Sequence, residues 1–222
     1  MKSLNARKSQ QDATAKRRER VIALSKIARN LAIKGKSSGD HAGRTPFSIC
    51  VMSDQTRIDD PETLFSILPR GSAFIFRDYT HPERLAVAKT LRARAAQHGV
   101  LFLVAGDFAL ASRVHADGLH VPGWMLAKPG LWQSFKGIRT TACHSPADLQ
   151  KAALFGADLA LLSPVFATRS HQGAPHLGRA AFLAMTRQAS LPVMALGGID
   201  YENASRLGGA NVSGIAAISA FS

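Results

Sequence analysis

Two glycines and a serine near the end of the sequence have the spacing of a phosphate site. Gly197 and Gly198 follow the apolar run Val193–Leu196, and Ser219 follows the next apolar run, Gly214–Ile218. Glycine allows backbone N–H groups to approach an anion closely, and serine adds a hydroxyl donor. The pattern predicts a phosphate-binding cup formed by Gly197, Gly198 and Ser219. A tight turn that needs glycine for steric reasons gives the same dipeptide, so this alternative stays open.

A polar loop between Ser163 and Gly173 follows an earlier apolar run. Its hydroxyl and basic side chains suit a segment that folds over a polyphosphate and closes a site. A solvated surface loop has the same composition and fits equally well. The side chains concerned are Thr168, Arg169, Ser170 and His171.

Three ionisable residues stand one or two positions after other apolar runs: Arg77, Asp107 and His144. Arg77 can grip phosphate oxygens in a bidentate manner, or pair with Asp54 or Asp78. Asp107 can bind Mg²⁺, although capping the following helix is the commoner role, and one carboxylate can do both. His144 can act as a general acid or base, or be held by a neighbouring backbone group. The sequence has no nucleophile motif, no CxxC and no paired-histidine metal spacing.

Eight short apolar runs after Thr45 alternate with helix-like stretches, which is typical of a parallel sheet. Eight strands in so short a segment predict closure into a compact α/β (βα)8 TIM barrel, whose function lies at the C-terminal strand ends. An open doubly wound sheet is the alternative, but no G-x-G-x-x-G follows any run. The runs are Phe47–Met52, Ala73–Phe76, Val100–Ala105, Gly118–Val121, Ile138–Cys143, Leu159–Leu162, Val193–Leu196 and Gly214–Ile218.

The helix-like stretches between these runs carry recognisable start and stop signals, such as proline in the first turn, a serine N-cap at Ser145 and glycine after the last turn. The fourth crossover, Pro122–Phe135, is poor in helix signal. The expected helices are Pro61–Leu68, Pro82–Gln97, Asp107–His115, one from Ser145 to Gly156, Gly178–Ala189 and Asp200–Leu207.

The first 45 residues predict a basic N-terminal extension, residues 1–45, ahead of a barrel domain, residues 46–222. Residues 1–12 are polar and aperiodic, which predicts disorder. From Ala13 to Lys34 an apolar stripe with helical spacing predicts an amphipathic helix. The sequence ends soon after the eighth run, so no eighth outer helix is expected and the N-terminal helix could cover that gap. The stripe consists of Val21, Leu24, Ala28 and Leu31.

The net charge of +13 is concentrated in the extension, which holds +9, whereas the other residues hold only +4. A mildly basic body suits anionic small-molecule substrates and makes nucleic acid an improbable partner. No apolar run is long enough to span a bilayer, so no membrane partner is expected. Cys50 and Cys143 lie in strand-like runs and predict buried, reduced thiols in a cytoplasmic protein. A homo-oligomer is compatible with these features but is not indicated by them.

Four stretches together resemble the thiamine-phosphate synthase/TenI-like family of small barrels, over Phe47 to Phe221. The resemblance implies an enzyme of thiamine biosynthesis, a transferase that joins a pyrimidine diphosphate to a thiazole phosphate and releases pyrophosphate with Mg²⁺. The stretches are Ala116–His120, Ser163–Thr168, Pro192–Ile199 and Gly214–Ala220.

The resemblance also implies roles for matching residues. Gly198, with Gly197, and Ser219 would bind the thiazole phosphate. Arg77 would stabilise the departing pyrophosphate, and Asp107 would help to hold Mg²⁺. The remaining pyrophosphate ligands implied in this way are Thr168 and Ser170.

The sequence departs from the family pattern in the diphosphate half of the implied site. Of the Gln-x-Arg-x-Lys motif only Arg77 remains, and the Asn-Asp after the third strand is Gly106-Asp107. The second aspartate that binds Mg²⁺ has no match, and the Thr-x-Thr-Lys loop reads Thr-Arg-Ser-His from Thr168. TenI-type thiazole tautomerases lack the diphosphate site and use a histidine that matches His144. Three readings follow: a divergent synthase, a tautomerase, and a non-catalytic phosphate-ligand regulator.

Overall fold

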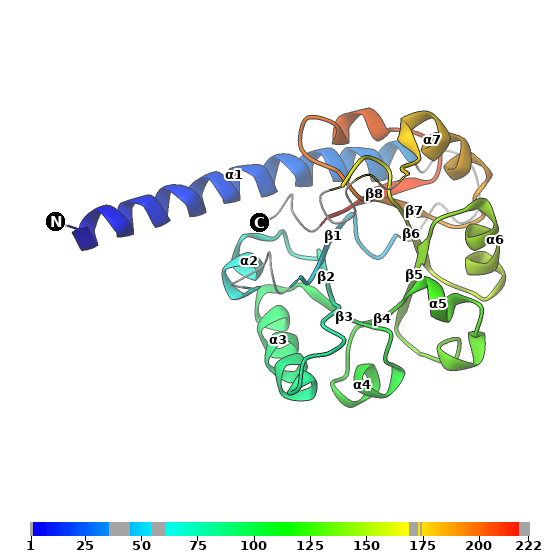
Figure 1. Ribbon diagram of the computed structural model, residues 1–222, viewed down its shortest axis with the longest axis horizontal. Helices are drawn as coiled ribbons and strands as arrows, with labels where there is room; N and C mark the ends of the chain where they lie inside the picture. Colours follow the sequence, from blue (N-terminus) through cyan, green and yellow to red (C-terminus); the bar gives the residue numbers. More distant parts are fainter. Residues whose placement is uncertain (1, 36–44, 55–60, 169–172, 174, 218–222) are drawn as a thin grey trace.

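Eight parallel strands close into a barrel in the computed structural model, which describes residues 2–35, 45–54, 61–168, 173 and 175–217 (Figure 1). Each strand pairs with its neighbour in the sequence, and β1 pairs with β8 through Ile49 opposite Ile215. This closure confirms the predicted barrel and rules out the open sheet. The strands are β1 Ile49–Met52, β2 Ala73–Phe76, β3 Leu101–Ala105, β4 Gly118–Val121, β5 Ile138–Cys143, β6 Leu159–Leu162, β7 Val193–Leu196 and β8 Val212–Ala217.

Helices surround the barrel as an outer ring (Figure 1). Most of them match the predicted stretches to within two residues at their starts, including the N-cap at Ser145, whose hydroxyl accepts a hydrogen bond from the Asp148 amide. The fourth crossover holds only two short helical turns, α5 and η1. The outer elements are α1 Lys2–Gly35, α2 Pro61–Ile67, α3 Arg84–His98, α4 Phe108–Arg113, α5 Gly123–Leu126, η1 Pro129–Leu131, α6 Pro146–Leu154, α7 Gly178–Gln188 and η3 Ala204–Leu207.

The helix expected at Asp200–Leu207 is wrong in its first half. Residues 201–203 form a turn, and only η3, a 3₁₀ helix, follows. The Asp200 carboxylate accepts the backbone N–H groups of Glu202 and Asn203, and the Asn203 side chain accepts the N–H of Asp200. Such local side-chain bonds compete with the hydrogen bonds of a regular helix, which explains the difference.

Two apolar layers hold the barrel together because side chains alternate along each strand. Cys50 and Met52 belong to a cluster inside the barrel, whereas Ile49 and Val51 belong to a larger cluster that faces the helices. Both cysteines are buried free thiols, as predicted, and burial raises the pKa of Cys143 to about 12. In the part of the chain that the structure describes, no helix has the length and apolar character needed to cross a membrane.

Helix α1 packs on the outside of β8, beside η3, and takes the position of an outer helix (Figure 1). All four residues of the predicted stripe are buried, and the Gly35 carbonyl accepts a hydrogen bond from the Asn211 amide. A side chain at Gly35 would collide with the backbone of Val212, so this glycine permits the close contact. The prediction that this helix covers the barrel is therefore confirmed; the division at residue 45 stays a prediction.

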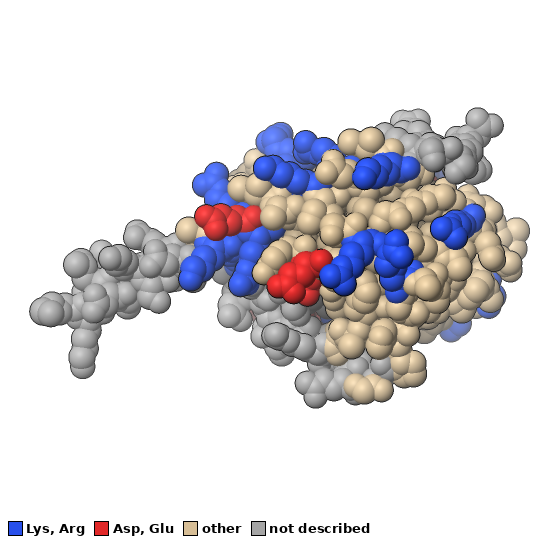
Figure 2. All heavy atoms as spheres, turned by 90° about the horizontal axis from the view of Figure 1, so that it is seen from above, with Lys and Arg blue, Asp and Glu red and all other residues tan. Residues whose placement is uncertain are grey.

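The expected disorder of residues 1–12 is wrong, because α1 begins at Lys2. The segment lacks proline and glycine, and half of its twelve residues are alanine, arginine, lysine or glutamine, which are good helix formers. A helix whose C-terminal half is fixed on the barrel extends at little cost, since each added residue gains one hydrogen bond. The first half of α1 projects away from the barrel (Figure 1), and on the face that carries its second half Lys and Arg side chains cover more of the surface than Asp and Glu (Figure 2).

Candidate functional site

The C-terminal ends of the strands form a mouth with a buried polar floor. His120 of β4 and Thr140 of β5 are both buried, and His120 Nδ1 lies 2.9 Å from Thr140 Oγ1. Burial, and to a smaller extent the charge of Arg77, lowers the pKa of His120 to about 3. The floor therefore carries a neutral imidazole, which can donate and accept hydrogen bonds but carries no charge at neutral pH.

Arg77 follows β2 and lies at the rim above this floor. Its backbone N–H donates to Ser53 Oγ at 2.7 Å, and the same hydroxyl lies 3.2 Å from Asp78 Oδ1. Arg77 Nη2 is 3.8 Å from Asp54 Oδ2, and the Arg77 side chain is 34% exposed. Of the two ion pairs considered from the sequence, the pair with Asp54 is the one present, although it is too long for a strong hydrogen bond.

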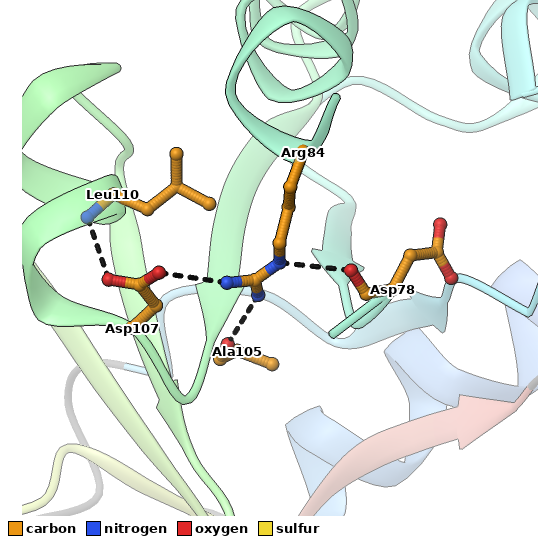
Figure 3. Close-up of polar contacts among 5 residues, drawn as sticks. All are labelled: Asp78, Arg84, Ala105, Asp107 and Leu110. Atoms are coloured by element: carbon orange, nitrogen blue, oxygen red, sulfur yellow. Dashed lines mark hydrogen bonds and ion pairs between the residues drawn. The ribbon is translucent and has the colours of Figure 1, made fainter. Parts of the chain in front are cut away.

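Asp107 caps α4 and is clamped by an arginine that sequence reasoning missed (Figure 3). Its Oδ1 accepts the Leu110 N–H at 2.9 Å, which confirms the predicted N-cap, and its Oδ2 accepts Arg84 Nη1 at 2.9 Å. Arg84 Nε donates to the Asp78 carbonyl at 2.9 Å, and Nη2 donates to the Ala105 carbonyl at 2.8 Å. Three bonds thus hold the guanidinium between the ends of β2 and β3.

The side chains near Asp107 do not fit the ligand set of Mg²⁺. This ion prefers near-octahedral oxygen coordination and usually takes one or two carboxylates. Both Asp107 oxygens already accept hydrogen bonds, and one of these comes from a cation. Within the described ranges, no three His, Cys, Asp or Glu side chains cluster in a way that could hold a metal. Mg²⁺ binding by Asp107 stays a prediction that these contacts do not support.

Aromatic side chains stand beside this clamp. Gly106 has a φ of +68°, and a Cβ there would lie 3.0 Å from Tyr79 and 3.4 Å from Trp124. Tyr79 is 46% exposed and Trp124 is 61% exposed. The Arg84 guanidinium lies 5.7 Å from the centroid of the Tyr79 ring. Tyr79 occupies the position of the lysine in the motif of the resembled family, so an aromatic ring stands where that motif has a cation.

His144 follows β5 and is exposed at the mouth. Its Nδ1 lies 2.8 Å from the Ser163 carbonyl oxygen, and its backbone N–H donates to Asp148 Oδ2 at 2.9 Å. A carbonyl only accepts hydrogen bonds, so Nδ1 carries the proton of the neutral ring and Nε2 keeps its lone pair. The two readings of His144 are thus compatible, since the backbone contact fixes the tautomer that a base requires.

Gly197 and Gly198 follow β7 with φ values of +94° and +65°. A Cβ on Gly197 would lie 2.9 Å from Pro164, and a Cβ on Gly198 would collide with the Ala167 carbonyl oxygen. The Phe166 amide donates to the Gly197 carbonyl at 3.0 Å. The loop after β6 is therefore packed on the two glycines, so steric need accounts for part of this dipeptide.

Asn203 is a second residue that sequence reasoning missed. Its Nδ2 donates to the Gly198 carbonyl at 2.9 Å and so fixes the loop after β7. An asparagine three residues after an aspartate is a common turn signal, which could have indicated this role. Thr168 is half-buried and follows Ala167, whose carbonyl lies over Gly198. The remaining predicted residues, Arg169, Ser170, His171 and Ser219, lie outside the described residues.

The strand ends thus bring Arg77, Asp107, His144, Thr168 and the glycine pair to one rim of a closed (βα)8 barrel, which defines the class of protein. The model of the thiamine monophosphate synthase family matches residues 49–221, and the chain belongs to this family.

Relatives with curated descriptions agree with this membership. The chain is 32% identical over 171 residues to a thiamine-phosphate synthase of Thioalkalivibrio sulfidiphilus, covering 74% of this chain and 81% of the relative. It is 32% identical over 165 residues to a putative thiamine-phosphate synthase 2 of Aquifex aeolicus, covering 72% and 88%. The solved thiamine phosphate pyrophosphorylase of Pyrococcus furiosus superimposes with a TM-score of 0.64 at 23% identity, covering 84% of this chain and 88% of that one.

Proposed function

We propose that this protein acts on a thiazole phosphate in thiamine biosynthesis, and that its chemistry is a proton transfer on the thiazole ring by His144. The contact between His144 Nδ1 and the Ser163 carbonyl carries this proposal, because it leaves Nε2 as the basic atom. Nε2 would take a proton from one ring position of the substrate and return it to another, so that tautomerisation consumes no other reactant. A positioned histidine of this kind contributes about 10²–10⁴-fold to rate.

The phosphate of the substrate would bind further along the rim, at Gly197, Gly198 and Ser219. The two positive φ values support this assignment, since left-handed glycines turn successive N–H groups toward one point. Asn203 supports it further by holding the Gly198 carbonyl in its turn. Substrate contact by Ser219 rests on the family resemblance.

A second candidate is the synthase reaction, in which a thiazole phosphate displaces pyrophosphate from a pyrimidine diphosphate. The curated relatives carry this name, and Arg77 at the rim favours it. Arg77, Thr168 and Ser170 would stabilise the charge that develops on the pyrophosphate. Mg²⁺ would normally share this task, but the contacts of Asp107 give no support for it. The clamp by Arg84 therefore makes this the second choice.

Two assays on the full-length chain separate the candidates. The first follows tautomerisation of a thiazole phosphate spectroscopically, where H144Q should lower kcat about 100-fold or more with little change in melting temperature. H98Q is the matched control, because His98 ends α3 at the other end of the barrel. Full activity in H144Q would refute the proposed base.

The second assay supplies pyrimidine diphosphate, thiazole phosphate and Mg²⁺, and measures released pyrophosphate. Release that D107A abolishes would support the synthase and contradict the tautomerase as the main activity. If the wild type shows neither activity but still binds thiazole phosphate, this would support a non-catalytic regulator, the third reading of the sequence.

A further inference from the structure

Arg84 is a largely buried cation at the mouth, and three observations make it more than a surface ion pair. Its guanidinium donates to three acceptors, namely the Asp107 carboxylate and the carbonyls of Asp78 and Ala105 (Figure 3). Its side chain is only 14% exposed. It also lies 5.6 Å from the centroid of the Phe76 ring, on which it packs.

The position of Arg84 in its helix needs an explanation from outside the helix. Arg84 is the first residue of α3; the N-cap Glu83 makes no side-chain capping bond, and the first turn contains no acidic residue. A cation there is disfavoured by the positive end of the helix dipole. The carboxylate and carbonyls that Arg84 contacts supply the compensating negative potential, so its placement reflects the strand ends rather than the helix.

We infer that Arg84 is a built-in cation that takes the place of a divalent metal beside Asp107, so that the mouth binds its phosphate ligand without Mg²⁺. The inference rests on the proposed function for the identity of that ligand. It assigns Arg84 as a positioning residue, which acts through Asp107 and the ends of β2 and β3.

The charges around Asp107 explain why a metal is excluded. Mg²⁺ lies about 2.1 Å from a ligand oxygen, so an ion on Asp107 Oδ2 would stand next to the guanidinium that already donates to this atom. Like charges repel strongly in such a partly buried place. Around Gly106 the nearest side chains are those of Tyr79, Pro122 and Trp124. The nearest strand-end aspartate, Asp78, contacts the guanidinium through its carbonyl oxygen, and among the described residues no three His, Cys, Asp or Glu side chains gather there to hold a metal.

An internal control is present on the same helix. Arg92 of α3 donates to Asp117 at 3.0 Å and to the His115 carbonyl at 3.0 Å. This pair has the same chemistry as Arg84 with Asp107, but Asp117 immediately precedes β4 and so lies at the end of the barrel away from the mouth. A change at Arg92 therefore removes a similar contact without touching the rim.

The first experiment titrates the ligand-free, full-length protein with Mn²⁺, used as a paramagnetic substitute for Mg²⁺, and measures bound ion by electron paramagnetic resonance. The wild type, R92M and R84K should show no saturable binding at millimolar Mn²⁺, because each keeps a cation beside Asp107. R84M should gain affinity by about tenfold or more, since the carboxylate loses its partner. Adding D107N to R84M should abolish the gain.

Saturable Mn²⁺ binding by the wild type that D107N removes would overturn the inference, and this result does not depend on whether R84M folds. Equal Mn²⁺ binding by R84M and R92M would overturn it as well.

The second experiment measures the dissociation constant of a thiazole monophosphate for the wild type in EDTA and in Mg²⁺. We expect the two values to agree within about twofold, and a tenfold weakening in EDTA would overturn the inference. Failure of the thiazole phosphate to bind under both conditions would refute the proposed function instead, while the Mn²⁺ titration would still decide the role of Arg84.

Discussion

The two halves of the mouth are built by different means. The half after β6 and β7 is built from backbone, with two left-handed glycines packed under the loop that contains Pro164. The half after β2 and β3 is built from side chains, with Arg84 and Asp107 joined to each other. The glycine half depends on the absence of a side chain at two positions, because a Cβ there would meet Pro164 or the Ala167 carbonyl. The other half depends on two charged side chains, so one substitution there can change its charge.

Truncation of α1 should have the largest effect on stability. It should destabilise the half after β6 and β7 more than the half after β2 and β3. Removal of residues 1–35 uncovers the outer face of β8 and deletes four buried side chains. Burial of a valine or leucine contributes about 1.5–3 kcal/mol, so we expect a loss of roughly 5 kcal/mol or more. Hydrogen exchange should then rise in residues 193–217 before it rises in residues 101–121.

The matched control for this truncation removes only residues 1–12, part of the half of α1 that projects from the barrel (Figure 1). Its melting temperature should stay close to that of the full chain. An unchanged melt after removal of residues 1–35 would contradict the covering role of α1.

Substitution of a glycine in the cup should have the next largest effect. In G198A the new Cβ meets the Ala167 carbonyl and the residue is held at a φ of +65°. We expect a loss of about 2–4 kcal/mol in unfolding free energy together with weaker phosphate binding. The measurements are chemical denaturation and a titration with thiazole phosphate.

A comparison with G71A separates the cost of backbone strain from the cost of steric collision. The φ of Gly71 is +79°, but a Cβ there meets nothing within 4 Å. G71A should therefore cost only about 1–2 kcal/mol, from the left-handed conformation alone. Equal losses in G71A and G198A would show that the packing of the loop after β6 contributes nothing to the cup.

The last expected effect concerns the floor between the two halves, and it is gradual because it depends on pH. Burial depresses the pKa of His120 to about 3, whereas an unfolded histidine titrates near pH 6.5. Below pH 6.5 the unfolded chain takes up a proton that the folded chain does not. Stability is therefore fully present above about pH 6.5 and falls as the pH drops toward 3, by up to about 1.4 kcal/mol per pH unit.

Urea denaturation between pH 7.5 and 4.5 measures this slope. H120Q keeps a neutral polar group on the floor, so its stability should fall less steeply with acid than that of the wild type. H98Q is the control and should keep the wild-type slope. Identical slopes in H120Q and the wild type would mean that His120 takes up its proton in the folded state over the same pH range as in the unfolded state.

The sequence by itself determined those features that depend on neighbouring residues. Alternating apolar runs and helix signals predicted the barrel. The spacing of Val21 and Leu24 predicted the buried face of α1. The serine at position 145, just before the helix, predicted the N-cap of α6. These signals are local, because strand and helix periodicity and capping involve residues a few positions apart.

Only the tertiary structure decided which strand-end residues meet. Arg84 and Asp107 are 23 residues apart, and their contact requires that α3 begin directly over the end of β3. The tautomer of His144 depends on a carbonyl 19 residues away, at Ser163. No local pattern encodes such contacts, since they arise when the barrel closes and fixes the strand ends side by side. The sequence thus indicated a phosphate site, whereas the fold decided that a guanidinium stands beside Asp107.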